Sequence, residues 1–144
     1  MKPLDTFGRF FVTNLRDKSL DNLQNLLDGH WKAPELQSLQ SKLSSFSPDE
    51  RVVVRELVET LLTDAMHDLL FAFQESHDCS SGIEITVNDA PVAALSDGLH
   101  GEIFGEDGWI VRFSKHPAEA EIARSRRAEE DIRRIIGESD DGRD

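Results

Sequence analysis

Apolar residues recur at every third or fourth position through the first half of the chain, which is the spacing of amphipathic helices. Three short helices are expected there: one behind Pro3, a second capped by Ser19 and ended by Gly29, and a third from Pro34. Their apolar faces carry Leu4, Phe7, Phe11 and Leu15, then Leu20, Leu23 and Leu27, then Leu36, Leu39 and Leu43.

A stronger start signal precedes a fourth and longer helix. Ser47 can cap its N-terminus, Pro48 suits its first turn, and Glu50 can close a capping box. No helix breaker follows until after Glu75, so this helix should be the longest in the molecule. At about 100° per residue, its core face is predicted to carry Val54, Leu57, Val58, Leu61, Leu62, Ala65, Leu69 and Phe73. The opposite face then carries Glu56, Thr60, Asp64, His67, Phe71 and Gln74.

After Gly82 the apolar period changes from helical to two, which is typical of strands. Residues 83–87 alternate, and residues 88–91 (Asn-Asp-Ala-Pro) are expected to turn the chain into a second strand over 92–95. Strands over 102–104 and 109–114 are expected around a turn at 105–108. The sequence therefore predicts an α+β fold, in which N-terminal helices and one long central helix pack against a small antiparallel β-meander.

A third pattern begins at Pro117. Residues 117–136 predict a charged C-terminal helix with a thin apolar stripe, and residues 137–144 have the composition of a disordered tail. The expected organisation is a single α+β domain over 1–116, a helical extension over 117–136 and a disordered tail over 137–144.

The negative charge is concentrated in one segment. Residues 49–107 hold fourteen acids against two bases, a net charge of −12 that equals the charge of the whole chain. Such a segment attracts a basic protein and repels nucleic acid and anionic membranes. A single cysteine, no long apolar run and no signal-peptide pattern favour a cytoplasmic protein without a disulfide.

Candidate binding residues lie in this acidic segment. Phe71 is a large aromatic among charges and needs a cover, either from the chain itself or from a partner. Two glycine-rich connections supply the acids Asp97, Glu102, Glu106 and Asp107. Oxygen ligands on loops suit Ca²⁺, but their spacing is not that of an EF-hand, and turns use Asp and Gly for backbone reasons. We therefore expect no metal and no cofactor, and assign Phe71 and the four acids to partner binding.

Two other functions compete with partner binding. Asp64 and His67, three residues apart, could form a general base or supply two metal ligands of a small hydrolase or metal-dependent enzyme, helped by a loop acid such as Asp97 or Glu102. A charged outer helix face is the commoner reason for such a pair. The remaining alternative is a homo-oligomeric housekeeping protein, a homodimer paired through its C-terminal helix.

Three stretches carry a resemblance. Residues 67–75 (HDLLFAFQE) and 96–102 (SDGLHGE), with 105–114 (GEDGWIVRFS), resemble a small bacterial family of unassigned function, over residues 1–116. In size and acidity the chain is also similar to bacterial immunity proteins, which neutralise a toxin by direct binding. The leading hypothesis is a non-enzymatic, immunity- or inhibitor-like module that engages a basic protein.

Overall fold

The protein is predominantly helical and carries one small sheet, so its α+β class is confirmed. The computed structural model describes residues 1–116 and 130–137. In chain order the elements are α1 (Pro3–Phe11), η1 (Val12–Asp17), α2 (Lys18–Leu27), α3 (Pro34–Ser44), α4 (Pro48–Asp78), β1 (Thr86–Val87), β2 (Ala90–Pro91), η2 (Val92–Leu95), η3 (Leu99–Gly101) and α5 (Trp109–Phe113). Residues 130–137 are also helical. The rest of the predicted extension and tail lies outside the described residues.

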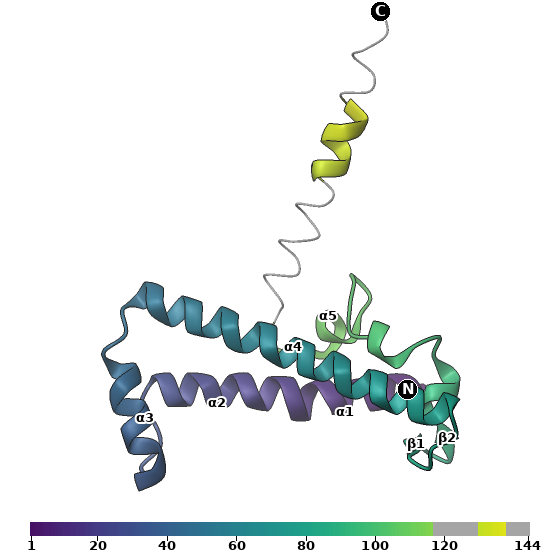
Figure 1. Cartoon of the computed structure of the whole chain (residues 1–144), viewed down its shortest axis with the longest axis horizontal. Helices are drawn as coiled ribbons and strands as arrows, with labels where there is room; N and C mark the ends of the chain where they lie inside the picture. The colour runs from purple at the N-terminus through teal and green to yellow at the C-terminus, as the bar shows by residue number, and fades with distance from the viewer. Residues whose placement is uncertain (117–129, 138–144) are drawn as a thin grey trace, which may run out of the picture.

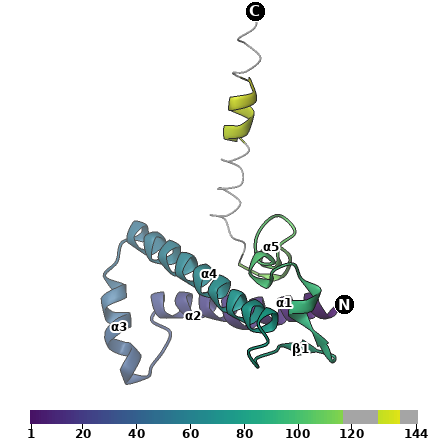
Figure 2. The ribbon, with the colours of Figure 1, turned by 45° about the vertical axis from the view of Figure 1, so that its right-hand side comes forward.

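The first two predicted helices form one uninterrupted helical run from Pro3 to Leu27, joined by the π-helical η1. The prediction that Ser19 caps a separate helix is wrong, because the residue before α2, Asp17, already has helical φ and ψ angles. The predicted stop at Gly29 is confirmed by its φ of 68°, which favours glycine. This run lies beside α4 (Figure 1), and α3 links the two at one end (Figure 2).

The start of α4 is confirmed, since the Glu50 amide donates to Ser47 Oγ at 3.2 Å. Its predicted core face is correct only in part, since Leu62 and Phe73 pack against the core. The fully buried apolar residues of α4 are Met66 and Leu70, whereas Leu57 and Leu61 are exposed. Apolar residues surround much of this helix, so two faces compete for burial. The face that carries Met66 is covered by η1, η2 and η3, and the face that carries Leu61 stays in solvent.

Only the first hairpin of the predicted meander forms. β1 and β2 pair antiparallel, with Thr86 opposite Pro91, around a turn in which Asn88 and Asp89 both have positive φ. The other predicted strands are wrong: residues 92–95 form the 3₁₀ helix η2, 102–104 form a turn, and Trp109 begins the helix α5.

Residues 109–113 form a helix rather than a strand because two consecutive side chains are buried. Trp109 and Ile110 are both buried, whereas a strand would place them on opposite faces. The Trp109 ring meets Phe7 edge-on at 5.8 Å and lies directly on Gly8 of α1. A Cβ at position 8 would occupy the space of the ring, so glycine is required there.

The core lies at one end of the molecule, where α1, the second half of α4 and residues 92–110 meet. It consists of Phe7, Phe11, Val12, Met66, Leu70, Val92, Ala93, Leu99, Ile103, Trp109 and Ile110. No residue of α4 before Met66 is buried. The first half of α4 therefore projects beyond the core.

Candidate functional site

Four rings gather where α4 passes η3, and we call them the ring cluster: His67, Phe71, His100 and Phe104. The His100 ring lies edge-on to both helix rings, with centroids 5.3 Å from His67 and 5.1 Å from Phe71. The Phe104 ring lies 6.0 Å from His67. Two residues of α4 thus meet two residues of the loop that follows the hairpin.

The two phenylalanines of the ring cluster remain partly open to solvent. Phe71 is 44% exposed and Phe104 is 41% exposed, although His100 packs against Phe71. The cover expected for Phe71 is therefore supplied only in part by the chain itself. Exposed aromatics beside polar groups are characteristic of protein interfaces.

Gln74 fixes the loop on α4. Its side-chain oxygen accepts from the Leu99 amide at 3.0 Å, and its nitrogen donates to the Ala93 carbonyl at 3.4 Å. Leu99 is fully buried next to His100, so the position of the His100 ring is set by the core. Gln74 was assigned to the outer face of the helix, and its burial corrects that prediction.

The predicted loop acids lie close in the chain to the ring cluster. Glu102 accepts a hydrogen bond from Ser96 Oγ at 2.6 Å, and the Gly98 amide donates to the same Ser96 oxygen at 3.1 Å. Asp97 is exposed in this turn. This part of the loop is therefore ordered by its own hydrogen bonds, while Asp97 keeps its carboxylate in solvent.

Glu106 and Asp107 are exposed in the turn between η3 and α5. Nearby, Arg112 donates to Asp5 at 2.9 Å, and this hydrogen bond raises the pKa of Arg112; the charges of Asp5, Asp107 and Glu102 raise it further. The same bond to Arg112 lowers the pKa of Asp5. Asp5 is thus the main partner of Arg112, and Asp107 and Glu102 add to its negative surroundings.

The Asp64–His67 pair predicted for an enzyme does not form the expected contact. His67 Nδ1 lies 3.1 Å from a carboxylate oxygen of Asp68, its neighbour in sequence, while Asp64 is exposed. The rings that contact His67 belong to Phe71, His100 and Phe104. Within residues 1–116 and 130–137, no group of three or more His, Cys, Asp or Glu residues could hold a metal ion.

Sequence reasoning missed His100 and Phe104. A signal for His100 was present in Gly98, two residues earlier. An added Cβ at Gly98 would lie 3.0 Å from the Cε1 atom of His100, so glycine makes room for the imidazole. Phe104 carries no comparable local signal, because its contact with His67 depends on the fold of the whole loop.

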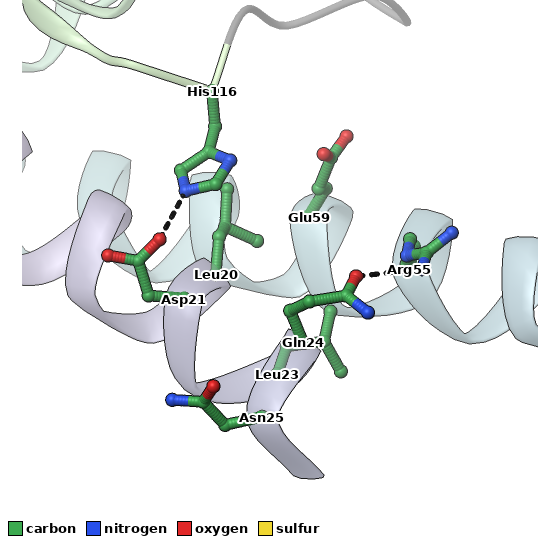
Figure 3. A pocket seen from close by; sticks show the side chains of 8 residues that line it. All are labelled: Leu20, Asp21, Leu23, Gln24, Asn25, Arg55, Glu59 and His116. Carbon is green, nitrogen blue, oxygen red and sulfur yellow. Dashed lines mark hydrogen bonds and ion pairs between the residues drawn. The ribbon is translucent and has the colours of Figure 1, made fainter. Parts of the chain in front are cut away.

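A hollow of about 420 Å³ lies between α2 and α4 (Figure 3). It is lined by Leu20, Asp21, Leu23, Gln24, Asn25, Arg55, Glu59 and His116. Arg55 donates to Gln24 at 2.8 Å, and Asp21 accepts from Lys115 at 2.6 Å and bonds His116 at 2.8 Å. The hydrogen bond from Lys115, followed by that from His116, lowers the pKa of Asp21.

Four of the polar side chains in this hollow form two pairs, Arg55 with Gln24 and Asp21 with His116. Ser114 Oγ also donates to Asp17 at 2.6 Å, so residues 114–116 are fastened to the N-terminal helical run at two acids. The hollow therefore anchors the chain where it leaves α5, and the ring cluster is the better candidate for binding.

No protein-family model, curated protein or solved structure matches the chain. The resemblance to a small bacterial family therefore stays a prediction. Among the described residues, no helix is both long and apolar enough to cross a membrane.

Proposed function

We propose that the protein is a cytoplasmic, non-enzymatic binding module that engages a basic protein, in the manner of an immunity or inhibitor protein. The observation that carries this proposal is the ring cluster itself. Phe71 on α4 and Phe104 in the loop after η3 are both more than 40% exposed, and both lie in the segment that holds the chain's excess negative charge. Phe71 and Phe104 would be the aromatic anchors at the centre of the interface. The loop acids Asp97, Glu106 and Asp107 would form its polar rim.

The chemistry of this surface favours a cationic partner. Aromatic anchors that exclude water carry much of the binding energy in protein interfaces, and arginine is enriched on the partner side. Arginine also stacks on phenylalanine faces, and Asp97, Glu106 and Asp107 can pair with further cations in the rim. Rim charges of this kind act mainly on the association rate through long-range steering.

The proposal is tested by affinity capture from an extract of the source organism, comparing three full-length chains. The wild type is compared with the double variant Phe71→Ala, Phe104→Ala and with Phe10→Ala. Phe10 is a matched control, because it is also an exposed phenylalanine, at 65%, but it lies on α1 away from the ring cluster. A basic protein should be retained by the wild type and the control and lost from the double variant.

The association and dissociation rates of the captured complex then distinguish the role of the aromatic anchors from that of the rim acids. Reversing the charges of Asp97, Glu106 and Asp107 to lysine should slow association at low salt by tenfold or more, whereas Phe71→Ala should mainly speed dissociation. Capture of no basic protein, or equal retention by the double variant and the wild type, contradicts the proposed function.

A further inference from the structure

The outer side of α4 carries an apolar stripe that the core does not use. Val53, Leu57 and Leu61 follow one another at intervals of four residues, which places them along one side of the helix. They are 62%, 57% and 59% exposed. We call these three residues the α4 stripe. A row of large aliphatic side chains in water is a surface that another apolar element should cover.

A matching element exists in the same chain. The helix at residues 130–137 presents Ile132 and Ile136, four residues apart, and they are 56% and 64% exposed. Most of the stability of a helix in a protein comes from the packing of an apolar face, because helix formation has a costly nucleus. Such a segment gains stability by packing its apolar side against another surface.

We propose that the helix at residues 130–137 packs in cis against the α4 stripe, with Ile132 and Ile136 between Val53, Leu57 and Leu61. The proposal concerns the first half of α4 and does not depend on the partner suggested for the ring cluster.

The connection is long enough for this contact. The chain is fastened at His116, which lines the same hollow as Arg55 and Glu59 of α4 (Figure 3). Thirteen residues, 117–129, separate this anchor from the helix, and thirteen residues can span at most about 43 Å. Passing around a helix of about 10–12 Å diameter requires roughly half of that length.

Charge favours this occupant over the α4 of a second copy. The two arginines of α4 are engaged with α2 and its C-cap: Arg51 bonds Asp28 at 3.0 Å and Arg55 bonds Gln24. The flanks of the stripe therefore present Glu50, Glu56 and Asp64. Two such helices would oppose acid to acid. Residues 130–137 instead carry two acids and two arginines, so they have no net charge, and Arg133 lies next to Ile132 on the helix.

Cysteine pairs in the full-length chain test the contact. The native thiol Cys79 is exposed, so it is first replaced by serine. Ile136→Cys is then combined with Leu57→Cys in one chain and with Leu61→Cys in another, and each is oxidised at low micromolar concentration. A disulfide requires Cβ atoms within about 4.5 Å, so at least one pair should form an intramolecular disulfide, visible as a faster-migrating monomer on a non-reducing gel.

The matched control replaces Ile136→Cys with Arg134→Cys, which places the thiol on the other side of the same helix at a similar tether length. Its cross-linking should be at least tenfold slower. Equal rates for both thiols would show that the tether alone brings them together, and would overturn the proposal. Disulfide-linked dimers would overturn it in favour of exchange between two copies, and absence of any disulfide would overturn it as well.

Hydrogen exchange supplies a measurement without cysteines. Amides of residues 130–137 should exchange at least tenfold more slowly in the wild type than in Leu57→Asp, Leu61→Asp. Val52→Asp, at an exposed valine that lies about 100° around α4 from Val53 and off the stripe, should leave that protection unchanged. Fast exchange in the wild type, or protection that survives the two stripe substitutions, would contradict docking on the stripe.

Discussion

Replacing Leu70 with alanine tests which side of α4 supports the fold. The Leu70 side chain is 0% exposed and packs in the core with Met66 and residues of α1 and η3. The substitution removes three buried carbons, and at about 0.8 kcal/mol per carbon the lost transfer free energy is roughly 2.4 kcal/mol. The cavity left behind adds to this, so the free energy of unfolding should fall by about 3–5 kcal/mol.

Leu69→Ala is the matched control, because it makes the same change at the next residue of the same helix. Leu69 is 42% exposed, so only part of its transfer free energy is lost and water fills the space. The expected cost is about 1 kcal/mol. Urea unfolding of both variants, monitored by far-ultraviolet circular dichroism, gives the two free energies of unfolding, provided that their dependence on urea concentration has the same slope.

The sequence pattern favoured the opposite result, since it placed Leu69 on the core face of the helix and left Leu70 off it. Equal losses at the two positions, or a larger loss for Leu69→Ala, would show that the buried side of α4 is not the one that carries Met66 and Leu70. The assignment of the α4 stripe to solvent would then fail with it.

Three further outcomes follow from individual contacts. Gly8→Ala should lower stability by about 1–3 kcal/mol and shift tryptophan fluorescence to the red, because the added Cβ displaces the Trp109 ring; thermal melts with emission spectra measure both. Gln74→Leu should cost about 1–3 kcal/mol in urea unfolding, because the Leu99 amide and the Ala93 carbonyl lose their partner. The lowered pKa of Asp21 contributes stability above roughly pH 4 that is lost as pH falls through the lowered value; the urea midpoint of Asp21→Asn should therefore depend less on pH in that acidic range than that of the wild type.

Helix ends were the part of the fold that local chemistry decides. The Ser47 hydroxyl caps α4 by accepting a hydrogen bond from the amide of Glu50, three residues later. Gly29 follows the end of α2 with a positive φ angle. Both signals act within one helical turn, so the sequence contains them completely. Ser19 is the exception, because its surroundings in the continuous helical run satisfy the backbone without a cap.

The buried faces and the short C-terminal elements could not be predicted in the same way. Trp109, Val111 and Phe113 alternate as a strand would, yet a window of five residues does not distinguish a period of two from a helical turn. The helical conformation places the Trp109 ring against Gly8, about a hundred residues earlier in the chain, where the missing Cβ leaves room for the ring. Likewise, Phe71 was recognisable as an aromatic among charges, whereas its contact with His100 required the loop to be placed by Gln74.

The two halves of α4 differ in local stability, and this difference bears on their roles. The second half is held by Met66, Leu70 and Gln74 and also carries Phe71, so the ring cluster is pre-organised by the core. A pre-organised surface loses little conformational entropy on binding, which suits an inhibitor-like module. The first half has no buried residue and therefore opens at lower free energy. Cover on the α4 stripe would stabilise the helix where the core does not reach, and would leave the binding surface around Phe71 free.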